Sequence, residues 1–287
     1  MPDVFAMFND EDYAQASASA GQSYQSEDYS TQVSESANYS QDSNKTFVIS
    51  LGGSVVVSEQ INTELVSRFS SLLNSLIPQG YKFVVVVGGG RTARDYVAAG
   101  KTLNTTNFVL DELGIQATRL NAKLVIQAFG NAHPEVLTDI NRAKEILASG
   151  KIPVFGGLLP GITTDCVAAL LAESLKAKFV NLSNVDGVYS SDPKTNPKAK
   201  FYTTISHNEL IKVVAKAVIA SGGPSQNIIL DLPSCLVLKR SNIKGFILNA
   251  QDTNNLSNAF QGLEFKGTTV FSDEETPTNS GIEKVQF

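Results

Sequence analysis

The chain has 287 residues, of which 42% are hydrophobic and 18% are charged, and its formal net charge is −5 at pH 7. A chain of this size buries roughly three quarters of its unfolded surface, which predicts one large globular domain or two fused lobes. Its apolar runs stay far below the ~20 residues that cross a bilayer, so the sequence excludes a membrane span.

The start of the chain and its two cysteines give further expectations. No signal-peptide or Arg-rich transit pattern opens the sequence, so we expect a cytoplasmic protein. Cys166 and Cys235 lie outside any metal-binding spacing, and we expect both to be buried as small apolar residues. The sequence therefore predicts no metal site built by the protein alone.

The first 45 residues differ in composition from the rest of the chain. They hold eight acidic residues and one lysine, are rich in Ser, Gln and Tyr, and contain no Leu or Ile. Too little apolar surface is available there to offset the entropy of ordering. We therefore expect a disordered acidic tail over 1–45, a folded domain over 46–271 and a flexible C-terminal tail over 272–287.

Strands and helices alternate from residue 46 onward. The uniformly apolar runs Thr46–Leu51 and Lys82–Val87 are typical of parallel strands covered on both faces. Helical spacing of apolar residues predicts a helix over Glu59–Ile77 and a longer one over Thr106–Phe129, interrupted near Gly114.

The second half of the chain continues this alternation. Strands are expected at Lys151–Phe155, Lys178–Ser183, Gly245–Asn249 and Thr268–Phe271, and helices at Asp165–Lys176, at Ser206–Ser221, from Asp231 onward and at Asn254–Gln261. The pattern predicts an α/β fold, a three-layer α/β/α sandwich around a mainly parallel central sheet.

Glycine clusters follow three of the expected strands, at Gly52-Gly53, Gly88-Gly89-Gly90 and Gly156-Gly157. Ligands of parallel sheets bind beyond the carboxyl ends of the strands, and glycine lets backbone N–H groups approach phosphate closely. One such cluster could be only a tight turn, but three favour a polyanionic ligand.

The second cluster also fits a dinucleotide-binding fingerprint, Gly88-x-Gly90-x-x-Ala93, with Asp111 as a possible ribose ligand. That fingerprint needs its acid at the end of the next strand, whereas Asn107 to Gly114 is typical of the start of a helix. The context therefore argues against a dinucleotide site.

Four segments together resemble the amino acid kinase superfamily: Ile49 to Ser54, Val86 to Arg94, Pro160 to Asp165 and Ser183 to Pro193. Leu113 to Ala122 and Lys266 to Thr269 are similar to the archaeal type of uridylate kinase within it. The resemblance runs from about residue 46 to 271. It implies Mg²⁺-dependent transfer of a phosphoryl group from ATP to UMP in pyrimidine nucleotide biosynthesis. The acceptor would lie on about 46–160 and ATP on about 161–271.

The resemblance also implies roles for individual residues. Positions matching the ATP site are Gly53, Ser54, Gly90, Arg94, Ser183, Tyr189 and Asp192. Positions matching the UMP site are Gly89, Asp111, Leu159, Pro160, Gly161, Ile162, Thr163, Thr164 and Asp165. Catalysis would rest on Arg94, Asp165 and Asp231. Asp165 could instead serve only the dipole of its helix, and Asp231 could serve only as a helix cap.

The family resemblance further implies a homo-oligomer, most often a hexamer, with no nucleic-acid or membrane partner. The long helix from Thr106 to Phe129 has more apolar positions than one covering face needs: Val109, Leu113, Leu120, Leu124 and Ile126. They could line a subunit interface or simply pack on the sheet.

One departure from the family pattern concerns charge. Bacterial members carry a Lys on the first strand where this chain has Ser50, so the usual cation near the transferred phosphate is missing. Lys198 and Lys200 could replace it or could be solvated surface charges.

Two other functions stay open: a non-catalytic nucleotide or oxyanion binder, and a kinase for another small phosphate or carboxylate. His133 and His207 lack catalytic partners at suitable spacings, and we expect both at the surface.

Overall fold

A computed structural model describes residues 45–193, 195–221 and 229–273. The tails expected over 1–44 and 274–287 lie outside the described residues. No helix in the described ranges has the length and apolar character that crossing a membrane requires.

An eight-stranded sheet forms the centre of the fold, in the order β3-β4-β2-β1-β5-β9-β10-β8. Its strands are β1 Thr46–Leu51, β2 Lys82–Val87, β3 Ala132–Leu137, β4 Ile152–Phe155, β5 Lys178–Ser183, β8 Thr204–Ser206, β9 Gly245–Asn249 and β10 Thr268–Phe271. Neighbouring strands are parallel except β9 and β10, which are antiparallel. The arrangement confirms the predicted mainly parallel sheet.

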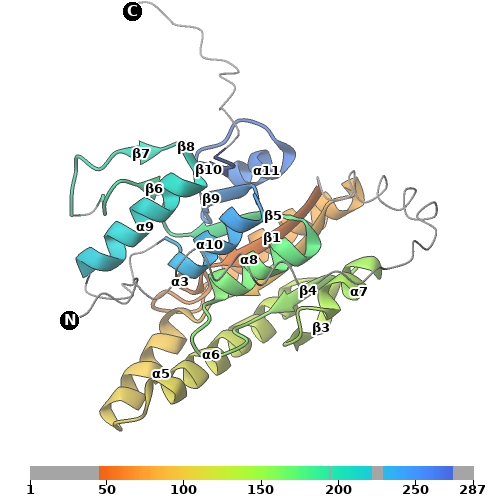
Figure 1. Ribbon diagram of the computed structural model, residues 1–287. Helices are drawn as coiled ribbons and strands as arrows, with labels where there is room; N and C mark the ends of the chain where they lie inside the picture. Colours follow the sequence, from red (N-terminus) through yellow and green to blue (C-terminus); the bar gives the residue numbers. More distant parts are fainter. Residues whose placement is uncertain (1–44, 194, 222–228, 274–287) are drawn as a thin grey trace, which may run out of the picture. The chain divides into compact units, whose positions relative to one another are not determined.

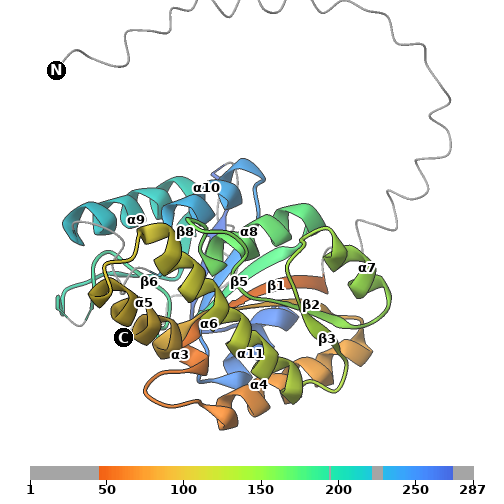
Figure 2. The same ribbon diagram turned by 90° about the horizontal axis from the view of Figure 1, so that it is seen from below.

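Helices cover both faces of this sheet, as Figures 1 and 2 show. The helices are α3 Gly53–Val56, α4 Thr63–Leu76, α5 Gly90–Thr102, α6 Asn107–Ala128, α7 Arg142–Ala148, α8 Thr164–Leu175, α9 His207–Ser221, α10 Leu232–Arg240 and α11 Thr253–Gln261. Alternate residues of β1 divide the core: Phe47 and Ile49 pack with α4, α6 and α11, whereas Val48 packs with α7 to α10. The predicted α/β/α sandwich is thereby confirmed.

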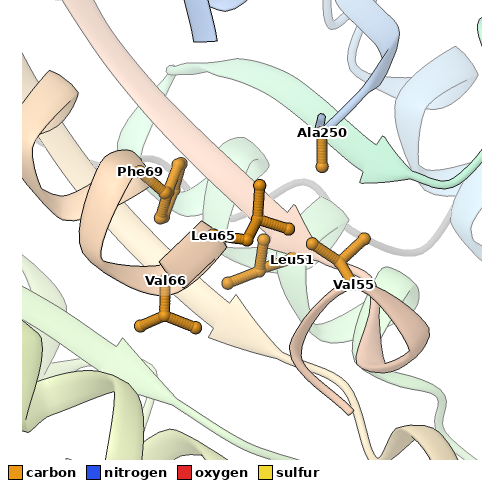
Figure 3. A pocket seen from close by; sticks show the side chains of 6 residues that line it. All are labelled: Leu51, Val55, Leu65, Val66, Phe69 and Ala250. Atoms are coloured by element: carbon orange, nitrogen blue, oxygen red, sulfur yellow. The ribbon is translucent and has the colours of Figure 1, made fainter. Parts of the chain in front are cut away.

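A small apolar pocket lies in the first of these core layers. Figure 3 shows its lining of Leu51, Val55, Leu65, Val66, Phe69 and Ala250. All six side chains are apolar and the space does not admit a water molecule. It is a packing feature of the core, because a ligand pocket needs some polar groups to orient its ligand.

Helix α6 corrects one prediction, since it runs unbroken through Gly114. A Cβ at this glycine would meet nothing closer than Val97, at 4.0 Å. A single glycine weakens a helix by only about 1 kcal/mol relative to alanine, and the packing of α6 outweighs that effect.

The histidine prediction is wrong for His207, which is buried. Its Nε2 lies 2.9 Å from the carbonyl oxygen of Ile243, so the ring joins the start of α9 to the turn before β9. His133 is also largely shielded, with 18% of its side chain exposed. Cys166 and Cys235 are buried, as expected.

Candidate active site

Two glycine loops interlock at the carboxyl ends of β1 and β2. A Cβ on Gly53 would lie 2.0 Å from the backbone nitrogen of Gly90, and a Cβ on Gly90 would lie 2.2 Å from the carbonyl oxygen of Gly53. Gly90 also has a φ of +57°, which favours glycine. Both residues must be glycine for the loops to touch, and the contact brings the predicted ATP-loop positions Gly53, Ser54 and Gly90 together.

Helix α6 holds the expected acceptor loop in place. Asp111 Oδ2 accepts a hydrogen bond from the Gly161 N–H at 2.8 Å, and Thr118 Oγ1 accepts one from the Gly157 N–H at 2.6 Å. Arg119 Nε donates to the Gly157 carbonyl at 3.1 Å. The loop that follows β4 is therefore fixed by one face of a single helix.

The same helix reaches the second glycine loop. Asn121 is buried, and its Nδ2 donates to the carbonyl oxygens of Gly88 at 3.0 Å and Gly89 at 2.9 Å. Thr118, Arg119 and Asn121 were absent from the expected site residues. The sequence signals for them are the family resemblance of Leu113 to Ala122, which assigns them no individual role, and their spacing with Asp111 within one helix, which does not distinguish them from solvated polar residues.

Asp165 lies at the second position of α8 and is bound to two neighbouring strands. Its Oδ1 accepts hydrogen bonds from Ser50 Oγ at 2.6 Å and from Asn181 Nδ2 at 3.0 Å. Ser50 and Asn181 are register partners on β1 and β5. The pKa of Asp165 is raised to about 6, chiefly by burial and also by the charge of Asp231, against the opposing hydrogen bonds from Ser50 and Asn181.

Asp231 caps α10 and also faces the acceptor loop. It accepts hydrogen bonds from the Ser234 N–H at 2.7 Å and from the hydroxyl groups of Ser234 and Thr163. Thr163 in turn caps α8, because its hydroxyl accepts from the Cys166 N–H at 3.1 Å. The N-termini of α8 and α10 thus meet at one side of the site, and Asp231 is a cap and a site neighbour at once.

The acceptor loop exposes two large apolar side chains. Leu159 and Ile162 are exposed, and Gly161 between them has a φ of +79°. Pro160 and Thr164 belong to the same segment, which leads from β4 into α8. The loop therefore offers apolar side chains beside the Asp111 carboxylate.

The ATP-side residues from the C-terminal half lie after β5. The Asn184 Nδ2 donates to the Ser54 carbonyl at 3.2 Å, which brings the end of β5, with Ser183, beside the first glycine loop. Tyr189 lies in the hairpin formed by β6 (Val188–Tyr189) and β7 (Phe201–Tyr202), where its ring packs on Phe201 with centroids 5.0 Å apart. Asp192 begins the turn beyond β6.

The basic candidates differ in their surroundings. Arg94 lies one turn after Gly90 in α5 and is partly exposed. Lys200 Nζ sits 5.3 Å from the centroid of the Tyr202 ring, and Lys198 is exposed. Arg94 therefore begins close to the phosphate loops, whereas the two lysines belong to the hairpin region.

Residues 45–249 match the family model described as the amino acid kinase family. The chain is 40% identical to the uridylate kinase of Pyrococcus abyssi over 225 residues, which cover 78% of this chain and 98% of that relative. It is 39% identical to the uridylate kinase of Archaeoglobus fulgidus over 224 residues, with the same coverage.

Solved structures show the same similarity in three dimensions. The crystal structure of the Archaeoglobus fulgidus uridylate kinase matches with a TM-score of 0.69 at 37% identity, covering 78% of this chain and 99% of that one. The crystal structure of the UMP kinase from Ureaplasma parvum has a TM-score of 0.65 at 22% identity, which shows the fold alone; it covers 79% of this chain and 99% of the other.

Proposed function

This chain belongs to the amino acid kinase family, and we propose that it transfers the terminal phosphoryl group of ATP to UMP and so forms UDP. The membership confirms the resemblance inferred from the sequence. The observation that carries the proposal is that α6 forms hydrogen bonds to two loops. Asn121 bonds the glycine loop after β2, and Asp111 bonds the acceptor loop. No observation favours the non-catalytic binder or another acceptor.

Phosphoryl transfer depends on placing two anions in line and neutralising the charge that spreads over the transferred group. We assign ATP phosphates to the interlocked loops of Gly53 and Gly90, and UMP to the loop from Leu159 to Asp165 with Gly89 and Asp111. Arg94 would contact a phosphate from α5, because a guanidinium can donate to two phosphate oxygens at once. Ser183, Tyr189 and Asp192 are proposed for the adenosine end of ATP.

Mg²⁺ is the proposed partner of ATP, and the residues around Asp165 suit it. Asn181 Oδ1 is buried without a hydrogen-bond partner among the described residues, next to the carboxyl of Asp165. Carboxylate and amide oxygens are the ligands that Mg²⁺ prefers. Asp165 and Asp231 would hold the ion, which supplies positive charge to the phosphates. Ser50 would orient Asp165 at the position where bacterial members carry a lysine.

An acceptor comparison tests the proposed function directly. Turnover of ATP is measured with UMP, CMP, dCMP and acetylglutamate as acceptors. We expect UMP to be preferred over CMP by roughly 5- to 150-fold per unpaired contact, because a buried polar group that meets the wrong base edge costs about 1–3 kcal/mol. Equal rates with UMP and CMP would contradict the proposal, and nucleotide binding without turnover would favour the non-catalytic alternative.

We further propose that the chain forms a homo-oligomer, a hexamer, and that it acts in the cytoplasm without a nucleic-acid partner. Helices α5 and α6 lie side by side and project from the sheet (Figures 1 and 2). They expose large apolar side chains at Tyr96, Leu103, Phe108, Val109 and Leu120. Of the interface residues expected from the sequence, Ile126 is buried in the core and is excluded.

A further inference from the structure

The β6–β7 hairpin, which carries Tyr189, stands apart from the central sheet. Its strands pair only with each other in the described sheets, with Val188 opposite Tyr202 and Tyr189 opposite Phe201. Two residues per strand are too few to hold a fixed position alone. The placement of Tyr189 therefore depends on what attaches the hairpin to the sheet.

Thr268, the first residue of β10, attaches both strands of the hairpin through its side chain, next to a backbone hydrogen bond from the Thr269 N–H to the Thr203 carbonyl at 2.9 Å. Its side chain is fully buried. The hydroxyl oxygen accepts a hydrogen bond from the Val188 N–H at 2.8 Å, and the hydroxyl donates to the Tyr202 carbonyl at 2.5 Å. One hydroxyl thus satisfies a backbone group on each strand of the hairpin, and its single proton is committed to Tyr202.

The turn before the hairpin is held by the same segment of chain. Asp186 forms an ion pair with Lys266 at 2.6 Å and accepts a hydrogen bond from Asn249 Nδ2 at 3.0 Å. A Cβ on Gly187 would lie 2.5 Å from Thr268 Oγ1. Only glycine therefore lets the turn approach the Thr268 hydroxyl, so the contact is built from both sides.

We infer that Thr268 is a positioning residue for ATP: its hydroxyl fixes the hairpin that presents Tyr189, without touching the nucleotide. The inference rests on the proposed function, since Tyr189 is assigned to the adenosine end of ATP. Removing the hydroxyl leaves the Val188 N–H and the Tyr202 carbonyl unpaired in a buried place. The hairpin would then shift relative to β5 while the acceptor loop, held by α6, stays in position.

The test compares Thr268→Val, which keeps the side-chain volume, with Thr268→Ser, which restores the hydroxyl. Thr269→Val is the matched control on the same strand. We expect Thr268→Val to raise the KM for ATP about tenfold, in line with one lost buried contact, and to change the KM for UMP less than twofold. Thr268→Ser and Thr269→Val should keep the KM for ATP near that of the unchanged chain.

Hydrogen exchange at the Val188 amide gives a readout independent of activity. It should be faster in Thr268→Val and slow in Thr268→Ser. If the unchanged chain does not phosphorylate UMP, the proposed function fails, whereas binding of a fluorescent ATP analogue still tests Thr268.

An unchanged affinity for ATP in Thr268→Val overturns the inference. A loss of ATP affinity that is equal in Thr268→Val and Thr268→Ser overturns it too. If Thr268→Val does not fold, Gly187→Ala displaces the same hydroxyl from the other side. A folded Gly187→Ala with unchanged ATP affinity would also overturn it.

Discussion

Asp165 holds a titratable carboxyl between the Ser50 hydroxyl and the Asn181 amide, and burial raises its pKa from 3.8 to about 6. Between these two pH values the folded state binds the proton more tightly than the unfolded state. The free energy of unfolding therefore falls as pH rises from about 4 through 6. The decrease is about 1–2 kcal/mol once the partial exposure of this residue is taken into account.

We predict that Asp165→Asn raises the melting temperature by a few degrees at pH 8 and leaves it nearly unchanged at pH 4. The amide oxygen can still accept from Ser50 and Asn181, while the buried charge is removed. Turnover should be lost, because the proposed ligand for Mg²⁺ is gone. Calorimetry at both pH values measures the first effect. A stabilisation of equal size at pH 4 and pH 8 would contradict the electrostatic explanation.

Arg94 is expected to act on phosphate rather than on folding. We predict that Arg94→Ala lowers kcat/KM at least tenfold, because a charge-assisted hydrogen bond contributes about 1.5–3 kcal/mol. Its melting temperature should stay within a few degrees of the unchanged chain. Arg68→Ala is the matched control, since Arg68 forms an exposed pair with Glu64 on α4. Full activity with a clearly lowered melting temperature would show that Arg94 is structural.

At the scale of secondary-structure elements, replacing two different glycines by alanine should change the stability of the chain in opposite directions. Gly53→Ala places a methyl group 2.0 Å from the Gly90 nitrogen and must push the two phosphate loops apart. We expect it to abolish measurable ATP binding and to lower the melting temperature. Gly114→Ala lies mid-helix with open space around it, so it should stabilise the chain by about 0.5–1 kcal/mol.

ATP-analogue binding and thermal melting of the two variants, measured side by side, check this pair. Tight ATP binding by Gly53→Ala would show that the loops do not interlock as described. A destabilised Gly114→Ala would show that α6 needs the glycine for packing.

Several strands could be predicted from sequence to the residue. Thr46–Leu51, Lys82–Val87, Lys178–Ser183 and Gly245–Asn249 have the predicted bounds, because burial on both faces favours a continuous apolar run. Thr268–Phe271 also has its predicted bounds, and β4 begins one residue later than predicted, at Ile152. The edge strand β3 was missed, since only Leu137 in it is buried and Pro134 interrupts the pattern. Helix α5 could be expected only as a helical pattern after the second strand, without bounds, because its side chains are largely exposed.

The candidate site could be predicted in part, for a similar reason. Glycine loops can be recognised by residue type and by their position after a strand, and an acid by its place at the start of a helix. Gly53, Gly90 and Asp165 could therefore be found. Asn121 and Asn181 could not, because their roles depend on where α6 packs and on which strands are neighbours. At Ser50 the sequence indicates only that the lysine of bacterial members is absent. The hydrogen bond from Ser50 to Asp165 becomes visible in the structure, where β1 pairs with β5.

At the scale of the folded domain, the order of strands places the site. β1 lies at the centre of the sheet, with β2 and β4 on one side and β5 and β9 on the other. The strand order therefore reverses direction beside β1, and in open parallel sheets ligands bind at such a point, beyond the carboxyl ends of the strands, here β1, β2 and β5. The strands on the two sides of this point come from different parts of the chain, since β2, β3 and β4 end by Phe155 whereas β5, β8, β9 and β10 begin at Lys178 or later.

The exposed helix pair α5–α6 leads to the last prediction, which concerns assembly. Leu103 is 75% exposed and Leu120 is 64% exposed, and Phe108 lies on the same pair of helices. Large exposed apolar side chains on two neighbouring helices indicate an interaction site, and a second copy of this chain fits best because the family resemblance implies an oligomer. Light scattering of the full chain should therefore give a mass several times that of the 30.7 kDa subunit.

Replacement of the apolar side chains locates the interface. Phe108→Glu together with Leu120→Glu should shift the mass toward one subunit, because charged carboxylates would have to be buried in the contact. Leu263→Glu is the matched control, since Leu263 is also an exposed leucine but lies after α11, outside the helix pair. The oligomer should persist in that variant. A single-subunit mass for the unchanged chain at micromolar concentration would refute the assembly, and an intact oligomer in the double variant would place its interface elsewhere.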